Sequence, residues 1–324
     1  MTEQTAMAPT KPDRVPRIPL KGLPVTAFQH PLDRQATENL KRLRGFDWLV
    51  AKFVEYGIER IEYVRNIGGS IRVGPRQLPR HYQMLREACY ILDVPEPELY
   101  VADGSKTFTS GHNHPFIVIK SGVLGEPDDE VMAVIARELG HIKCGHVLYK
   151  MMAREIKPFF EMIDSVTLGI GGLVGAGIEA GLLAWDRRSK LSADRAALLA
   201  VQNDAPILNM LLKLAGGSDK LGSDLSLEQF LLQARAYQEG LDDRLSDRFY
   251  RFIANLDGTH PYAVERARAI DEWYDSGEYK DILAGKYGVS TMVRARVCPN
   301  PQCSAPLEPN QMFCSQCGMP LSRH

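Results

Sequence analysis

The chain has 324 residues, of which 44% are hydrophobic, so it can fill about two domains and build a large core. Its formal net charge of −1 gives no support for general binding to nucleic acid or to anionic membranes. No signal peptide is visible, and we therefore expect the protein in the cytoplasm.

The start of the chain is polar and rich in Pro, Thr and charge, which predicts a flexible leader over residues 1–25. A main domain follows over residues 26–290. Apolar residues at helical spacing predict a helix over Leu40–Tyr63 that wraps this domain. Short apolar or alternating runs predict strands over Ser70–Val73, Glu98–Val101, Thr107–Ser110 and Pro115–Lys120. We expect an α+β fold that is rich in helices and has a small antiparallel sheet.

The apolar helical run Val131–His146 carries the most informative motif, Arg137-Glu138-Leu139-Gly140-His141. Pro127 and the acidic residues beside it suit the positive start of this helix. Zinc peptidases place His-Glu-x-x-His on such a helix, where both His bind zinc and the Glu activates the metal-bound water. The Glu and the second His are present here, but Arg137 stands in place of the first His.

Two later segments support the motif: Lys190-Leu191-Ser192-Ala193-Asp194, and Thr259-His260-Pro261 followed by Arg266. Together the three motifs resemble those of the zinc metallopeptidase family that contains the CAAX prenyl protease and the HtpX heat-shock peptidase. The resemblance covers roughly residues 30–275 and implies a gluzincin-like fold. It also implies that Glu138 is the catalytic carboxylate and that Asp194 supports the metal site. By the same resemblance, His260 and Arg266 would stabilise the reacting carbonyl.

The chain departs from this family where zinc should bind. The resemblance places the ligands at Arg137, His141 and Lys190, but a guanidinium has no lone pair for zinc and an ammonium repels the metal. Catalytic zinc needs three protein ligands, so we expect no catalytic zinc ion in the cleft. The strand that binds the substrate backbone usually reads Asn-Ala-Phe, and here it reads Lys106-Thr107-Phe108.

We therefore interpret the protein as a pseudo-peptidase that binds a protein or peptide partner through its cleft. The two cations could replace the charge of the metal and neutralise Glu138 and Asp194, because unpaired buried carboxylates are costly. This predicts that Glu138 lies within about 4 Å of Arg137 or Lys190. It also predicts that His141, which is near these cations, is neutral.

Two alternatives stay open. An active metalloendopeptidase could use a rearranged Cys/His site, because Cys144 shares a helix stripe with His141, and His112 and His114 precede that helix. Alternatively, the cationic cleft could bind an anionic ligand or a peptide C-terminus.

The segment Ser165–Trp185 contains a single charge, Glu179, and Gly pairs at the spacing of packed membrane helices. One crossing would separate two motifs that must meet, and two crossings would need about 40 apolar residues. We expect a buried or oligomer-forming helix, with membrane contact as the alternative. Further on, Leu225–Glu239 and Asp242–Leu256 resemble amphipathic helices, and the tail Asp271–Lys286 closes the domain.

Four cysteines at the end of the chain, Cys298, Cys303, Cys314 and Cys317, have the spacing of two zinc knuckles. We predict a zinc ribbon over residues 291–324 that binds one structural zinc ion, because so short a segment could hardly fold without metal. A disulfide pair in an exported protein is the alternative. Few cations lie nearby, so we expect the ribbon to dock proteins and not nucleic acid.

Overall fold

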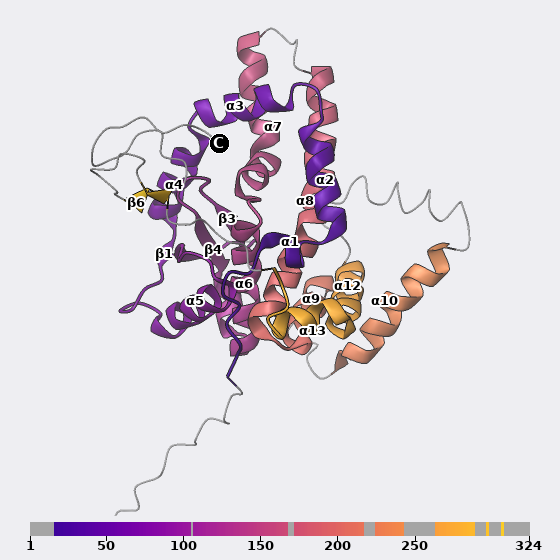
Figure 1. The fold of residues 1–324 in the computed structure, drawn as a ribbon. Coiled ribbons are helices and arrows are strands. Elements are labelled where there is room, and N and C mark those ends of the chain that lie inside the picture. Colours follow the sequence, from indigo (N-terminus) through magenta and orange to yellow (C-terminus); the bar gives the residue numbers. More distant parts are fainter. Residues whose placement is uncertain are drawn as a thin grey trace, which may run out of the picture.

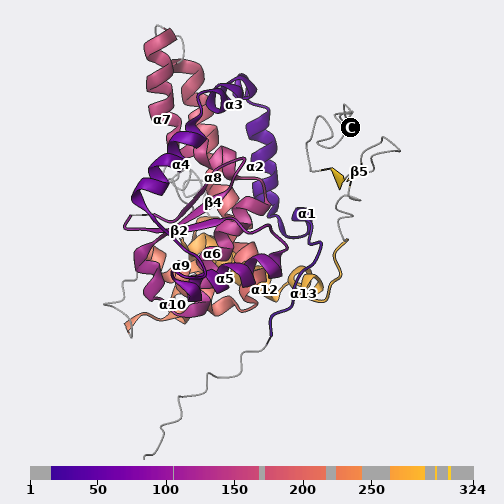
Figure 2. The same ribbon diagram turned by 90° about the vertical axis from the view of Figure 1, so that its left-hand side faces the viewer.

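The structure is a computed structural model that describes residues 16–104, 106–167, 172–216, 224–242, 263–288, 296–297 and 306–307. Helices dominate, and they pack around one small four-stranded sheet (Figures 1 and 2). The expected α+β class is confirmed at this level.

The sheet contains the four predicted strands, β1 (Ile71–Arg72), β2 (Glu98–Ala102), β3 (Phe108–Ser110) and β4 (Phe116–Lys120). Their order is β1-β2-β4-β3, so β3 lies at an edge. The prediction of an antiparallel sheet is wrong, because β2 and β4 pair in parallel. The reason is that β3 pairs antiparallel with β4 and occupies the edge of the sheet. The other side of β4 is therefore left to pair with β2, which runs in the same direction.

The predicted helix over Leu40–Tyr63 is broken into pieces. The structure has α2 (Pro31–Lys41), α3 (Phe46–Glu55) and α4 (Ile58–Gly69). Gly45 and Gly57 separate them with φ values of 83° and 64°, in the left-handed region that glycine enters without steric cost. Apolar spacing alone could not predict these corners, because it continues across both glycines.

Helix α4 is turned inside out relative to its hydropathy. Glu62 and Asn66 face inward and are 9% and 7% exposed, whereas Val64 and Ile67 face outward and are 57% and 52% exposed. The buried Glu62 accepts hydrogen bonds from Arg154 Nη2 at 2.7 and 2.8 Å and from the Ser110 hydroxyl. These partners compensate the burial of the carboxylate, since buried charges are stable only when paired.

The main core lies between the sheet and the helices α5 (Pro79–Leu92), α6 (Asp128–Lys143), α8 (Gly172–Val201) and α9 (Asp204–Ala215). Helix α6 begins where predicted, with Pro127 as its N-cap. It packs closely on α8 because Gly140 faces Ala193 and Ala196 of α8. This close approach brings the Glu138 helix next to the Asp194 helix.

A second core joins α2 and α3 to α7 (Val147–Thr167) and the first half of α8. The pair α7 and α8 rises side by side above the body (Figure 1). The predicted apolar segment Ser165–Trp185 spans the ends of both helices, and its residues Ile178, Leu182 and Trp185 are buried in this core. Among the described residues, no helix is long and apolar enough to cross a membrane.

The packed chain begins earlier than the predicted boundary at residue 26. Leu20 and Leu23 are 1% and 2% exposed and belong to the main core. Arg17 Nη2 lies 2.8 Å from Asp129 Oδ1 at the start of α6. The short helix α1 (Val25–Phe28) then leads into α2.

At the other end of the domain, α10 (Leu227–Asp242) matches the predicted helix over Leu225–Glu239. The predicted helix over Asp242–Leu256 lies outside the described residues after its first residue. The predicted tail over Asp271–Lys286 contains the end of α12 (Ala263–Asp275) and all of α13 (Gly277–Leu283). In the predicted ribbon, β5 (Arg296–Val297) and β6 (Pro306–Leu307) pair antiparallel, while its four cysteines lie outside the described residues.

The contact between α6 and α8 leads to a prediction. A Cβ at position 140 would lie 2.6 Å from Ala196 Cβ and 3.1 Å from Ala193 Cα. Overpacking costs about 1–3 kcal/mol, so Gly140→Ala should lower the midpoint of thermal unfolding. Gly177→Ala in α8 is the matched control, because its Cβ would meet nothing within 4 Å. That variant should keep or raise the midpoint, since Ala gains about 1 kcal/mol over Gly in a helix. Equal midpoints for the two variants would contradict the close packing.

Candidate active-site cleft

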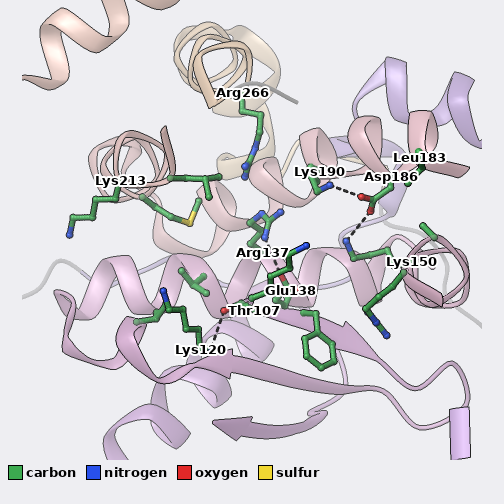
Figure 3. A pocket seen from close by; sticks show the side chains of 18 of the residues that line it. Thr107, Lys120, Arg137, Glu138, Lys150, Leu183, Asp186, Lys190, Lys213 and Arg266 are labelled. Atoms are coloured by element: carbon green, nitrogen blue, oxygen red, sulfur yellow. Dashed lines mark hydrogen bonds and ion pairs between the residues drawn. The ribbon is translucent and has the colours of Figure 1, made fainter. Parts of the chain in front are cut away.

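A cleft of about 940 Å³ lies between the edge of the sheet and helices α6, α7, α8, α9 and α12 (Figure 3). Seven of the predicted site residues line it: Lys106, Thr107, Phe108, Arg137, Glu138, Lys190 and Arg266. The first three lead into β3, the edge strand of the sheet. The three sequence motifs thus meet at one cleft, although Asp194 and His141 are buried and do not line it. His260 lies outside the described residues.

Glu138 is held by two neighbours. Arg137 Nη1 donates a hydrogen bond to Oε1 at 2.9 Å, and Thr109 Oγ1 donates one to Oε2 at 2.7 Å. Glu138 is 1% exposed and Thr109, in β3, is 0% exposed. The predicted distance between Glu138 and Arg137 is therefore confirmed. Both carboxylate oxygens are engaged by the protein itself.

Asp194 is shared by two guanidinium groups. Arg266 donates to both of its oxygens, from Nε at 2.7 Å and from Nη2 at 2.6 Å, in a bidentate pair. Arg137 Nε donates to Oδ1 at 3.3 Å. Asp194 and Arg266 are each 1% exposed. One buried carboxylate of α8 thereby connects α6 to α12.

Lys190 lies beside a second carboxylate. Its Nζ donates to Asp186 Oδ2 at 2.6 Å, and Lys150 Nζ of α7 donates to Oδ1 at 3.2 Å (Figure 3). Burial lowers the pKa of Lys190 to about 7, and the charges of Lys150 and Arg137 add to the shift, although Asp186 opposes it. The position of the family's third ligand is therefore occupied by a buried lysine that is paired with a carboxylate.

His141 lies at the end of a buried polar chain. Its Nδ1 is 3.1 Å from His146 Nδ1, and His146 Nε2 is 3.1 Å from Asp33 Oδ2. Burial, with the nearby charge of Lys150, holds the pKa of His141 well below its usual range, so this imidazole is neutral, as predicted. Asp33 in α2 also accepts a hydrogen bond from Ser192 Oγ at 2.6 Å, which ties α2 to α8.

Cations outnumber carboxylates in this cluster. Among the described residues it contains four cations, Arg137, Lys150, Lys190 and Arg266, and three carboxylates, Glu138, Asp186 and Asp194. Asp186 and Asp194 are therefore each shared by two basic side chains. Lys106 and Lys120 at the sheet side of the cleft add two exposed cations.

The side chains at the zinc-ligand positions do not fit zinc. Two of the three are the basic side chains of Arg137 and Lys190, and both are held in ion pairs with carboxylates. Within the described part of the chain, no group of three or more His, Cys, Asp or Glu could hold a metal ion. The alternative Cys/His site gains no support, because His112 and His114 line a different cavity, beside α3 and α4.

Sequence reasoning missed Thr109, Lys150 and Asp186, which form hydrogen bonds in the buried polar cluster beside the cleft. Asp186 could have been found, because it precedes Lys190 by one helical turn and such pairs lie on one face. Lys150 lies on another helix, and Thr109 lies on a strand. No local pattern in the sequence connects either of them to the motif.

Comparisons with known proteins cover most of this chain. The model of peptidase family M48 matches residues 76–274. Over 280 residues the chain is 34% identical to the plastoglobule-localized metallopeptidase 48, chloroplastic, of Arabidopsis thaliana, and the match covers 83% of this chain and 78% of the relative. It is 24% identical over 228 residues to a Protease HtpX homolog of Trichormus variabilis, covering 61% of this chain and 75% of the relative.

The shared carboxylate predicts a large effect on stability. Asp194→Asn should leave Arg137 and Arg266 buried without their counter-charge and lower the free energy of unfolding by about 3–5 kcal/mol. Asp271→Asn is the control, because its partner Arg235 is 59% exposed. Its loss should stay below about 1 kcal/mol. Urea unfolding measures both values, and similar losses would refute the importance of the buried network.

Lys190 predicts a dependence of stability on pH. Its pKa is about 7 in the folded protein and has the ordinary value of 10.5 in the unfolded chain. Between these values the unfolded chain binds one proton more, so the free energy of unfolding rises with pH. The rise should be about 2 kcal/mol from pH 7 to pH 9, at about 1.4 kcal/mol per pKa unit. Below about pH 6 both states are protonated and the contribution is constant.

The variant Lys190→Met should lose this rise, so urea unfolding of the two proteins at pH 7 and pH 9 isolates the contribution of Lys190. The comparison stops at pH 9 because Cys89 affects stability above this pH. Burial raises the pKa of Cys89 to about 12, whereas its thiol in the unfolded chain has the ordinary value of 9.0. Ionisation of the unfolded thiol therefore lowers the free energy of unfolding near pH 9 and above. Parallel pH profiles for the two proteins would contradict the assignment.

Proposed function

Because this chain belongs to peptidase family M48, we propose that it is a pseudo-peptidase, a family member that binds a protein or peptide partner in its cleft without cleaving it. The family predicted from the three motifs is confirmed by the family match and by the relatives. Loss of proteolysis and the binding role are the parts that we propose.

The occupation of the ligand positions by Arg137 and Lys190 is the observation that carries this proposal. Each cation is paired with a carboxylate of the cleft, at 2.9 Å for Glu138 and 2.6 Å for Asp186. These ion pairs supply positive charge where the family places a metal ion. A guanidinium or an ammonium can neutralise a carboxylate, but neither is a Lewis acid that lowers the pKa of a bound water.

The contacts of Glu138 support the same conclusion. A general base must accept a proton from a water that its carboxylate can reach. Here both oxygens of Glu138 accept hydrogen bonds from Arg137 and Thr109, and the side chain is 1% exposed. The arrangement favours a structural role for this carboxylate.

The remaining parts of the proposal concern the ends and surroundings of the domain. We propose a gluzincin-like fold and a C-terminal ribbon in which Cys298, Cys303, Cys314 and Cys317 bind one structural zinc ion. A protein partner suits such a ribbon better than nucleic acid does. Self-association and membrane contact through residues 165–185 also remain predictions.

For the compartment we propose the cytoplasm. The Arabidopsis relative is named as plastoglobule-localized and chloroplastic. Fractionation of the source cells should therefore compare the soluble fraction with lipid-rich particles.

The second candidate function is zinc-dependent proteolysis at a rearranged site. Its support is the family itself, since the relatives are named as a metallopeptidase and a protease. It requires metal ligands other than the residues at positions 137 and 190. Metal content separates the two candidates, because a working site would hold zinc in addition to the zinc of the ribbon.

The test measures zinc per chain and cleavage of an unfolded protein substrate. The full chain should bind about one zinc ion, as a four-thiolate site predicts, and a version that ends at Val293 should bind none. The double variant Arg137→His with Lys190→Glu should bind one zinc ion more than the full chain, because it restores two ligands beside His141.

Cleavage should be absent from the natural chain with or without a chelator. Glu138→Gln is the control, since it removes the carboxylate that an active family member would use in catalysis and keeps the shape of the side chain. Chelator-sensitive cleavage that disappears in Glu138→Gln would overturn the proposal. Stoichiometric zinc in the truncated chain would overturn it as well.

A further inference from the structure

We infer that the cleft binds the C-terminal carboxylate of an extended peptide, held by Arg137, Lys190 and Arg266 where the family places its metal ion. This inference rests on the proposed function, because it assigns to the cationic cluster the role of an anion site. It adds the chemical class of the ligand and the end of the ligand that is recognised.

An unused donor in the cleft is the first observation. Arg266 uses Nε and Nη2 for Asp194, and its Nη1 has no hydrogen-bond partner within the described part of the chain, although the side chain is 1% exposed. A buried donor without an acceptor is unfavourable. Arg266 lines the cleft, so an acceptor oxygen that enters its buried end would satisfy this donor.

The shared carboxylates of the cluster are the second observation. Lys150 and Lys190 share Asp186, and Arg137 and Arg266 share Asp194. A monoanion bound at this end of the cleft would add a further counter-charge for these basic side chains.

The edge strand supplies the third observation. One side of β3 pairs with β4, and no strand of the described residues pairs with its other side. An extended peptide can add to such an edge through main-chain hydrogen bonds. Lys106, Thr107 and Phe108 connect this edge to the cleft. Exposed Lys106 and Lys120 place two further cations on the path of an incoming anion.

The depth of the cluster favours a chain end over an acidic side chain. Lys190, Asp194 and Arg266 are 3%, 1% and 1% exposed, so the cluster lies at the buried end of the cleft. A peptide that passed through with a central acidic residue would need room on both sides of this point. A peptide that ends there needs room on one side only. Its planar carboxylate also suits the geometry of guanidinium donors.

The experiment compares two pools of random eight-residue peptides with a fluorescent N-terminal label. The pools differ only at the C-terminus, which is a free carboxylate in one and an amide in the other. The full-length protein should retain the carboxylate pool at least about tenfold better, as one charge-assisted contact implies. Equal retention of the two pools would overturn the inference, and so would retention of neither.

Two variants assign the preference to the cluster. Lys190→Met should abolish the preference for the carboxylate pool while the weaker retention of the amide pool persists. Lys213→Met is the matched control. Lys213 lines the same cleft, but its ion pairs are with Glu126 and Glu130, which are not part of the cluster. If Lys190→Met does not fold, Arg137→Gln tests the same cluster from α6. A preference that survives in the folded variants of the cluster would overturn the assignment.

Zinc content, measured on the same samples, separates this inference from the proposed function. Zinc beyond that of the ribbon would contradict the proposed function directly. Without such zinc, an absent carboxylate preference would refute the anion site alone and leave the pseudo-peptidase proposal standing.

Discussion

The carboxylate of Asp194 is the contact on which the geometry of the cleft depends. It is 1% exposed and lies between Arg137 of α6 and Arg266 of α12, so three helices meet at one buried charge. The close packing at Gly140 brings α6 near enough to α8 for this contact to form. The orientation of Arg137 follows from it, and so does the position of Glu138, which Arg137 contacts with its other nitrogen.

Ion pairs can preserve a fold after the loss of a metal because both supply the same sign of charge at the same place. The two replacements differ in what they permit. A metal ion leaves a coordination position for water, whereas paired side chains direct their donors at carboxylates of the protein. In this chain Lys190 and Lys150 approach Asp186 from two helices. Under the proposed function, these side chains bind an anion and do not activate water.

The sequence predicted those features that depend on residues close together in the chain. The four strands, the start of α6 at Pro127 and the meeting of Arg137 with Glu138 agree with the structure. Errors arose where a single residue overrides a periodic pattern, as at Gly45 and Gly57, or where pairing depends on topology, as in the parallel pair of β2 and β4. The partners Lys150 and Thr109 were missed because they come from other elements, and no spacing rule connects them to the motif.

The reversed polarity of α4 has a consequence for how the chain tolerates change. Substitutions on most helices are harmless at charged positions and harmful at apolar ones. Here the carboxylate of Glu62 is the buried anchor, held by Arg154 and Ser110, while Val64 and Ile67 face outward. Selection should therefore act on α4 in the opposite sense, with its acidic position constrained and its branched aliphatic positions free to drift. A substitution score based on hydrophobicity would rank the positions of this helix in the wrong order.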